Sequence, residues 1–559
     1  MNYCDIKKLT ANSRAEKWWE GIEKKIGNKW TTMQHNGVYF PPPYEPLPSK
    51  IQILYKNKPV KLDAISIKNP FRITAEEAAV FMAMKMEQDD RISEKDPDRK
   101  KAIDDKKFTD NFWKDWKKIL GSGHVIQSFK DVDFTPIQQY ISRRSEKKKT
   151  TPKEKKLLEK EDREAARDLY GYAVVDGIKI PLGNYMVQPP GLYIGHGEHP
   201  LRGRIKARIQ PKDVQLNVSK KNVPKCFVQE TFGQSIQPCK WGDVIQDHNV
   251  TWIAAYRHPV TKEMTYVWLK REASEWVCAS DIGKFDKARK LGENIAIVRK
   301  QYTKDLTNSK SEIRQLATAV YLLDIIAIRP GTEKDEAKES GTLGLTTLKC
   351  SNIIFGKDDR ITIDFVGKSA IKFEKTFKVE KIVYDNLQKL CKGKGKIAEI
   401  FPNVNAISLN NYLKTFLPDL TAKVFRTYKA SSILQNELSR NIPDINFPTH
   451  EKKLIYDKVN IEVAKALNHK KMGKSGDRVE KLKEKIKEFK KKKKDSNTPK
   501  QKASAQKSID INAAKLEEAE YNISTSTSKV NYLDPRITVA WCKSGEVPIE
   551  KIYNKTQLS

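Results

Sequence analysis

The pattern of apolar positions changes character at about residue 273. Between residues 185 and 269, short apolar runs such as VTWIAAY and MTYVWL alternate with segments rich in Gly and Pro, which predicts short strands and turns. After residue 273, longer segments with helical spacing of apolar residues dominate. We therefore expect a mixed α+β protein with a strand-containing first part and a mainly helical second part.

Two capping signals predict helices in the first part. The sequence TAEE at Thr74 is a capping box, in which Thr74 and the Glu three residues later each bind the other's backbone N–H, and it predicts a helix to Met86. The sequence TPKE at Thr151, with Pro at the first helical position, predicts a charged helix to about Tyr170. A basic helical segment precedes it, so we expect a charged helical pair at about 136–170.

Helical patterns in the second part predict a buried helix and a charged hairpin. The run 316–328 is the most apolar in the chain, but it is too short to span a bilayer and contains Asp324, so we expect a buried helix. Residues 478–494 are mostly Lys and Glu with apolar residues at coiled-coil spacing. DSNTPK interrupts them, and a second arm continues to about Tyr521. An antiparallel helical hairpin and a disordered basic linker are both consistent with this pattern.

The strong positive charge of the chain indicates what kind of partner the protein binds. The 559 residues carry 105 Lys and Arg against 71 Asp and Glu, a net charge of +34. The chain also has 10 Trp, 20 Tyr and 19 Phe, too many aromatic residues for a mainly disordered protein. A folded protein with this charge is expected to bind a polyanion. An anionic membrane is a weaker alternative, because the sequence has no clear basic amphipathic anchor.

Cysteine spacing and nucleotide-binding motifs argue against several functions. The seven cysteines are scattered without a CxxC pair, which indicates a reducing compartment and argues against a zinc finger. The chain does not open with a signal-peptide pattern. Both GKS sequences, at Gly367 and Gly473, lack the leading Gly of a Walker A motif. HGEH, which contains His196, has no further ligand cluster and predicts a loop. We therefore expect neither ATP nor a metal nor another cofactor.

Five residues could together perform metal-free chemistry on a phosphodiester. Such chemistry needs a nucleophile, cationic donors for the non-bridging oxygens and an acid for the departing oxygen. Arg329 follows the predicted buried helix, Lys368 lies at the tip of a predicted hairpin, and Arg426 lies in a predicted helix. His469 ends another predicted helix, whose C-terminus favours a protonated imidazole. Tyr532 lies in SKVNYLDPRITVAW. Taken singly, each residue type is more often an ordinary surface or core residue.

Four longer segments resemble one known family. VYFPPPYEPLP, FTDNFWKDWKKIL, LTAKVFRTYKAS and SKVNYLDPRITVAWCKSGEVPIEKIYNKTQ are similar to eukaryotic-type DNA topoisomerase IB, and the resemblance extends from about Trp30 to Gln557. The last segment is long and very specific. The resemblance implies a catalytic set that consists of the nucleophile Tyr532, the phosphate-binding Arg329, Arg426 and His469, and the general acid Lys368.

The family resemblance also implies an activity and a partner. The expected reaction is attack on one strand of duplex DNA, formation of a 3′-phosphotyrosyl link, swivelling of the broken strand and religation by the free 5′-OH. Torsional strain in the DNA drives relaxation, so neither ATP nor a metal is required. We expect a nuclear monomer that contacts mainly the DNA backbone. Further expected DNA contacts are Asn531, His196, Lys206, Arg208 and Lys423.

The implied architecture is a bilobed clamp around DNA. A mixed α/β cap lobe is followed by a helical catalytic lobe that resembles tyrosine recombinases, a coiled helical-hairpin linker and a small helical segment with the nucleophile. The expected boundaries are a short polar tail at 1–28, the cap lobe at 29–272, the catalytic lobe at 273–472, the linker at 473–520 and the C-terminal segment at 521–559.

Departures from the family pattern affect targeting and drug binding. The family's long charged N-terminal tail is nearly absent, so nuclear targeting signals are not clearly placed, and the chain ends at NKTQLS, short of the family's usual extension. The family's cap-lobe loop has an Arg where this chain has His196, and an Asp follows the family's hairpin Lys where this chain has Ser369. Both family residues contact the inhibitor camptothecin. Because Asn531, a third contact, is retained, the sequence predicts reduced rather than abolished camptothecin sensitivity.

Two other classes of protein are alternatives. Tyrosine recombinases share the same catalytic residue types, but they usually carry a His three residues before the second Arg, where this chain has Lys423. A non-enzymatic DNA clamp or chromatin protein would need the positive charge, but it would not need five catalytic residue types in their family context.

Overall fold

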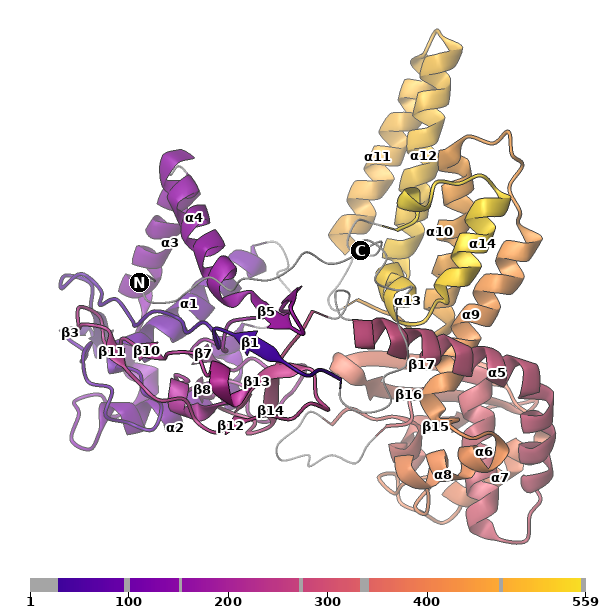
Figure 1. The fold of residues 1–559 in the computed structure, drawn as a ribbon, viewed down its shortest axis with the longest axis horizontal. Coiled ribbons are helices and arrows are strands. Elements are labelled where there is room, and N and C mark those ends of the chain that lie inside the picture. The colour runs from indigo at the N-terminus through magenta and orange to yellow at the C-terminus, as the bar shows by residue number, and fades with distance from the viewer. Residues whose placement is uncertain are drawn as a thin grey trace. The chain divides into compact units, whose positions relative to one another are not determined.

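The computed structural model describes residues 29–94, 101–149, 153–270, 275–331, 341–471 and 476–553. Figure 1 shows the course of the chain through its helices and strands. The described residues divide into two compact units, one that extends to Ala279 and one that begins at Ser280. Helices and small sheets occur in both units, so the predicted α+β class is confirmed.

The first unit combines four helices with several short sheets within its described residues. Its helices are α1 (Ala75–Ser93), α2 (Lys106–Leu120), α3 (Thr135–Lys149) and α4 (Lys153–Tyr170). Its strands are β1 (Met33–His35), β2 (Ile53–Tyr55), β3 (Lys58–Val60), β4 (Val132–Asp133), β5 (Tyr172–Val175), β6 (Ile178–Pro181), β7 (Gly191–Leu192), β8 (Ile205–Lys206), β9 (Val214–Asn217), β10 (Phe227–Val228), β11 (Gln237–Pro238), β12 (Val244–Ile245), β13 (Trp252–Arg257) and β14 (Met264–Trp268).

Short strands pair into small sheets around two apolar clusters of the first unit. The largest sheet has the order β12-β9-β13-β14, in which β12 runs parallel to β9 and the other pairs are antiparallel. One apolar cluster packs against this sheet and includes Trp30 and Ile253. The other surrounds α1 and α2 and includes Phe108, Phe112 and Trp116, all fully buried. The strand-and-turn pattern predicted for residues 185–269 is therefore confirmed.

The capping signals of the first unit are only partly confirmed. The Thr74 side chain accepts from the Glu77 backbone N–H as predicted, but the helix continues to Ser93. The sequence also predicted that the Glu77 carboxylate accepts from the Thr74 backbone N–H. This prediction is wrong, because the carboxylate instead accepts from the Arg208 guanidinium at 2.7 Å. A charge-assisted bond to a guanidinium is stronger than one to a backbone N–H. The second signal, at Thr151, lies outside the described residues, and the helix that follows ends at Tyr170 as predicted.

One cysteine pair runs against the reducing compartment that the scattered cysteines indicated. Cys226 and Cys239 form a disulfide beside the β10–β11 hairpin. The antiparallel register of the hairpin places residues 13 positions apart side by side, which a search for CxxC spacing does not detect. Three other cysteines, Cys350, Cys391 and Cys542, are free.

The second unit is mainly helical and contains one three-stranded antiparallel sheet in its described part. Its strands are β15 (Ile353–Phe355), β16 (Arg360–Gly367) and β17 (Ile371–Lys378). Its helices are most of α5 (Glu275–Asp305), then α6 (Ser311–Ile326), α7 (Lys381–Cys391), α8 (Ala406–Phe416), α9 (Ala422–Arg440), α10 (Thr449–Ala466), α11 (Gly476–Asp495), α12 (Pro499–Glu520), α13 (Thr525–Asn531) and α14 (Pro535–Ser544).

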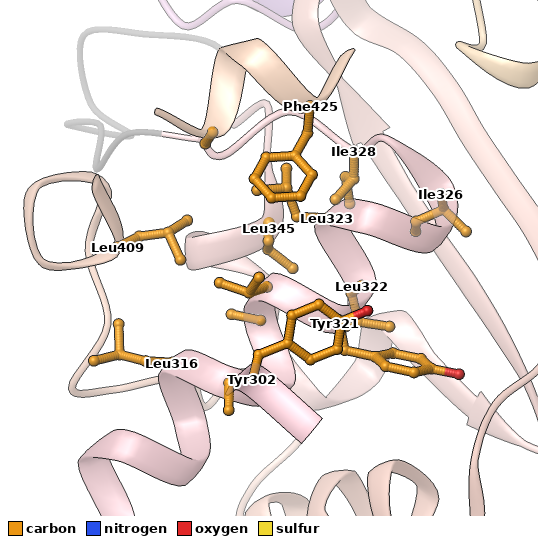
Figure 2. Packing of buried hydrophobic residues seen from close by; sticks show 14 of the residues in the cluster. Tyr302, Leu316, Tyr321, Leu322, Leu323, Ile326, Ile328, Leu345, Leu409 and Phe425 are labelled. Atoms are coloured by element: carbon orange, nitrogen blue, oxygen red, sulfur yellow. The ribbon is translucent and has the colours of Figure 1, made fainter. Parts of the chain in front are cut away.

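Helix α6 lies in the core of the second unit, as its apolar sequence predicts. Figure 2 shows its side chains packed with Tyr302 of α5, Leu345, and Phe425 of α9. Asp324 is buried within this helix, and it accepts from Arg299 at 2.8 Å and from the Tyr302 hydroxyl at 2.9 Å. These partners compensate the buried carboxylate. None of the helices in the described segments combines the length and apolar content that a bilayer span requires.

Helices α11 and α12 form a long antiparallel pair where the sequence predicts a charged hairpin (Figure 1). Leu482 on α11 and Ala505 on α12 are buried. At the base of the pair, Lys465 Nζ lies 2.9 Å from the Glu517 carboxylate. Lys471 forms a second ion pair, with the next glutamate of α12. The hairpin is therefore fixed to the end of α10, next to His469.

Candidate active site

Four of the five predicted catalytic residues meet in one place within the second unit. The Arg426 Nε–H donates to the Tyr532 hydroxyl at 3.4 Å, and Arg426 Nη2 lies 3.3 Å from His469 Nε2. Arg329 also hydrogen-bonds Tyr532 and acts on it electrostatically. We call this group of Arg329, Arg426, His469 and Tyr532 the phosphate pocket. Lys368, the fifth residue, lies on a hairpin tip described below.

The ends of helices position most of these side chains. Helix α6 is capped by Ala327, whose left-handed conformation (φ 49°) turns the chain toward Arg329. His469 follows α10 after the left-handed Asn468 (φ 53°), and its N–H donates to Ala464 O at 2.9 Å. Tyr532 is the residue immediately after α13. Arg426, by contrast, lies inside α9, and the burial of the adjacent Phe425 in the apolar core fixes the rotation of that helix.

Arg426 is a buried cation that joins the parts of the pocket. Its side chain is 3% exposed, and its guanidinium donates to Ala327 O, to Leu467 O at 3.2 Å and to the Tyr532 hydroxyl. Among the residues that the structure describes, no carboxylate lies within ion-pair distance of it. A buried cation without an anion is unfavourable, and a bound phosphate group would supply the missing charge.

His469 is neutral, so the sequence-based prediction of a protonated imidazole is wrong. The ring is 3% exposed, and burial together with the charges of Arg426 and Arg329 lowers the pKa of His469 to about 3. The helix-terminus argument failed because it assumes an exposed terminus, whereas this ring is desolvated beside two cations. The Nδ1 atom lies 2.8 Å from the Ser528 hydroxyl, a partner that the sequence did not suggest.

Tyr532 lies between the Arg426 guanidinium and the neutral His469 ring. Its ring centroid is 5.1 Å from the Arg426 guanidinium carbon and 5.0 Å from the His469 ring centroid. Burial raises the pKa of the Tyr532 phenol, but the guanidinium groups of Arg426 and Arg329 lower it, and the net shift is downward. The pocket therefore makes the phenol easier to ionise, and the phenolate is the nucleophilic form.

Two residues that the sequence analysis missed fix the backbone around Tyr532. The Ser431 hydroxyl on α9 donates to Tyr532 O at 3.1 Å and accepts from Asp534 N at 3.2 Å. The Asp534 carboxylate is buried, caps α14 and accepts from Arg289 at 2.8 Å. The Asp-Pro pair after Tyr532 is a helix-start signal that could have identified Asp534. Nothing in the sequence distinguishes Ser431 from other serines.

Lys368 lies at the tip of the β16–β17 hairpin, as predicted. Its side chain is exposed and makes no hydrogen bond or ion pair with another described residue. The hairpin is nevertheless attached near the pocket, because Asn468 Nδ2 donates to Lys372 O at 3.3 Å. On its other side, Leu343 N donates to Val366 O at 2.8 Å. The structure therefore holds the strands beside His469 and leaves the Lys368 side chain free.

Two further predicted DNA contacts lie near the phosphate pocket. Lys423 is exposed on α9, one turn before Arg426. Asn531 is exposed directly before Tyr532, and its amide donates to Thr527 O at 3.1 Å. Both side chains are accessible to a ligand of the pocket, and their contact with DNA stays a prediction.

Three predicted DNA contacts lie in the first unit. His196 is exposed in a loop, and burial lowers the pKa of Lys206 on β8. Arg208 is engaged within the unit, because it donates to the Glu77 carboxylate at 2.7 Å and to Pro42 O at 2.9 Å. These bonds favour a structural role for Arg208. Within the described segments, no group of three or more His, Cys, Asp or Glu side chains could hold a metal ion.

Comparisons with known proteins cover almost the whole chain. The family model for the DNA-binding fragment of eukaryotic DNA topoisomerase I matches residues 28–269, the model for its catalytic core matches 273–500, and a C-terminal topoisomerase domain matches 505–559. DNA topoisomerase 1 alpha of Arabidopsis thaliana is 39% identical over 95% of this chain and 58% of its own length. DNA topoisomerase 1 of Drosophila melanogaster is 35% identical over 97% and 54%, respectively. DNA topoisomerase 1 of Homo sapiens is 34% identical over 96% and 71%. The chain thus spans little more than half the length of the plant and fly relatives.

Proposed function

This chain belongs to the eukaryotic DNA topoisomerase I family, and we propose that it relaxes supercoiled duplex DNA as a type IB topoisomerase. The observation that carries the proposal is the contact of the half-buried Tyr532 hydroxyl with the buried Arg426, in a pocket that also contains Arg329 and His469. A nucleophile beside three phosphate donors is the arrangement that strand cleavage without a metal requires.

In the proposed reaction, the Tyr532 phenolate attacks the phosphorus of one DNA strand. A bond forms between the phenolic oxygen and phosphorus, and the bond from phosphorus to the 5′-oxygen breaks. The phenolic proton passes to solvent, and Lys368 gives a proton to the departing 5′-oxygen. The broken strand swivels, and the 5′-OH then attacks the 3′-phosphotyrosyl ester and restores the strand. The ester conserves the energy of the broken bond, so no ATP is needed.

The long contacts in the pocket support this role for its donors. Arg426 lies 3.3 Å from His469 and 3.4 Å from Tyr532, at the weak end of the hydrogen-bond range. Catalytic hydrogen bonds are often long without substrate and shorten when it binds. Arg426 can therefore turn these donors toward the non-bridging oxygens of a phosphate while its bonds to Ala327 O and Leu467 O hold it in place.

The rest of the chain is assigned to holding DNA and delivering the nucleophile. We assign 29–272 to a cap lobe, 273–472 to a catalytic lobe, 473–520 to the linker and 521–559 to the segment that carries Tyr532. The net charge of +34 supports a DNA clamp, and the protein is expected to act as a monomer in the nucleus. The ion pairs at the base of α11 and α12 support a tether that keeps Tyr532 close to the pocket.

Relaxation of a supercoiled plasmid tests the proposal and separates it from its rivals. The full chain should relax the plasmid without ATP and with a chelator present, and the rate should fall steeply as salt is added, because binding displaces counterions from the DNA. A tyrosine recombinase would need specific sites, and a non-enzymatic clamp would leave the linking number unchanged after protein removal. Tyr521→Phe, which removes the hydroxyl of an exposed tyrosine next to α12, is the matched control for Tyr532→Phe. The Tyr521→Phe protein should relax the plasmid normally. An unchanged linking number with folded, DNA-binding protein would refute the proposal.

A further inference from the structure

The imidazole of His469 has a partner at each nitrogen. Nε2 lies 3.3 Å from Arg426 Nη2, and Nδ1 lies 2.8 Å from Ser528 Oγ. Both partners are buried, and Ser528 is 0% exposed. A guanidinium can only donate, so Nε2 must accept the bond from Arg426. The neutral ring therefore carries its hydrogen on Nδ1 and donates it to the Ser528 hydroxyl.

This tautomer cannot perform the role proposed for His469. The nitrogen that faces the pocket has no hydrogen, so it cannot donate to a phosphate oxygen. Donation requires the other tautomer, with hydrogen on Nε2, in which Nδ1 becomes an acceptor. A hydroxyl group satisfies both states, because it accepts from Nδ1–H in the first and donates to Nδ1 in the second. A carbonyl or carboxylate at the position of Ser528 could only accept.

Ser528 also connects His469 to the nucleophile. It lies on α13, the helix that ends just before Tyr532, and its carbonyl accepts from Tyr532 N at 2.9 Å and from Leu533 N at 3.1 Å. The Ser528 side chain thus contacts His469, while its backbone carbonyl accepts hydrogen bonds from the turn that contains Tyr532. Arg426 and Arg329 are the charged groups that act on the His469 ring in the described structure.

We propose that Ser528 is a positioning residue that lets His469 adopt the tautomer needed to bind the scissile phosphate. When the phosphate enters, Arg426 turns toward it, the ring releases one proton from Nδ1 to water, and it takes one from water at Nε2. The charge of the ring is unchanged. Ser528 then donates to Nδ1, and Nε2–H donates to a non-bridging oxygen. This role rests on the proposed topoisomerase function and adds a positioning residue that supports its five-residue catalytic set.

The role can be tested by single-turnover cleavage. The substrate is an oligonucleotide from which the strand with the new 5′-OH dissociates after cleavage. Ser528→Ala should cleave about tenfold more slowly, because a buried hydrogen bond to the ring is lost. Ser528→Cys, which keeps a weak donor, should be intermediate, and Ser526→Ala, at an exposed position of the same helix, should be unaffected. In a His469→Ala background, Ser528→Ala should cause no further slowing. Equal slowing with and without His469, or no slowing at all, would overturn the proposal.

The tautomer itself can be read by ¹⁵N NMR of the histidine-labelled full chain. The free protein should show His469 with hydrogen on Nδ1, and the Tyr532→Phe variant bound to a duplex oligonucleotide should show it on Nε2. Ser528→Ala should reduce that shift, and Ser528→Cys replaces it if the Ala variant does not fold. A ring that keeps its Nδ1 hydrogen on DNA contradicts the role. If the unmodified protein cleaves no DNA, the topoisomerase proposal fails, whereas the spectra still decide whether Ser528 controls the tautomer.

Discussion

The phosphate pocket and the hairpin tip hold their cations in opposite ways. Arg426 is 3% exposed and donates to two backbone carbonyls and two side chains. Lys368 is exposed at the tip of the β16–β17 hairpin, and no other described residue binds its ammonium group. Both regions belong to one compact unit and are connected through the bond from Asn468 to Lys372.

This difference suits the two chemical tasks proposed for these residues. Groups that stabilise charge in a transition state work best when folding has already fixed and desolvated them. A general acid must instead keep its proton available and meet the leaving oxygen only when the substrate is in place. The contrast teaches that folding prepares the donors of the pocket, whereas Lys368 is expected to find its position only on DNA.

Among substitutions in these two regions, loss of the nucleophile should reduce cleavage and relaxation the most. Tyr532→Phe keeps the ring between Arg426 and His469 but removes the oxygen, so cleavage and relaxation should disappear while DNA affinity is retained. Denaturant-trapped covalent complexes and a filter-binding assay measure the two properties. Residual covalent complexes in the Phe variant would show that another residue is the nucleophile.

Removal of the buried cation should be the next largest effect. Arg426→Ala should slow cleavage by about 10²–10³-fold, as for the loss of one transition-state donor. Because Arg426 lowers the pKa of Tyr532, the variant should also regain part of its rate when the pH rises from about 7 to 9. Single-turnover cleavage across this pH range measures both effects. Arg440→Ala, which removes an exposed arginine at the end of the same helix, is the control, and equal losses in the two variants would contradict the special role of the buried site.

The hairpin tip should respond to a change in the leaving group. Lys368→Ala should slow cleavage without changing the free energy of unfolding by more than about 0.5 kcal/mol, because the side chain is exposed and has no described partner. A substrate with a 5′-phosphorothiolate leaving group needs no proton, so it should restore much of the rate in this variant and not in Arg426→Ala. If the sulfur substrate gives no recovery, Lys368 is not the general acid.

Burial of a neutral histidine should make the pocket sensitive to acid. The pKa of His469 is about 3 in the folded protein and about 6.5 when unfolded, so below pH 6.5 the unfolded chain binds a proton that the folded chain does not. Stability should therefore fall as the pH is lowered, and at pH 5 the contribution of His469 to this loss is about 2 kcal/mol. Urea unfolding at pH 7.5 and pH 5 should show a loss smaller by this amount in His469→Gln. The exposed His196→Gln variant is the control, and identical losses in all three proteins would show that His469 is not buried as a neutral ring.

The smallest expected effect concerns drug response at the exposed tip. Ser369 follows Lys368 with φ 63°, a conformation that Asp tolerates, so Ser369→Asp should leave the hairpin and relaxation intact. By family resemblance, Ser369→Asp together with His196→Arg should increase camptothecin-trapped cleavage complexes more than either change alone. Counting trapped complexes in the four proteins measures this. If the unmodified protein is as sensitive as relatives that carry Arg and Asp, the prediction is wrong.

Local patterns predicted the elements of the site, but not the bonds between them. The apolar run before Arg329, the alternation around Lys368 and the helical spacing around Arg426 each depend on nearby residues, and the structure has those elements. The contact of Arg426 with Tyr532 joins residues 106 positions apart and was implied only by the family resemblance. The charge of His469 was predicted wrongly, because desolvation by distant segments outweighs the helix terminus. Ser528 was missed because only its buried contact distinguishes it.

The most direct test is to identify the residue that becomes attached to DNA. The full chain should be incubated with a suicide oligonucleotide and denatured, the DNA trimmed with nuclease, and the protease fragments analysed by mass spectrometry. The proposed mechanism predicts a nucleotide linked through its 3′-phosphate to Tyr532, a released strand with a free 5′-OH, and no adduct in Tyr532→Phe. An adduct on any other residue, or a 5′-phosphoryl link, would contradict it.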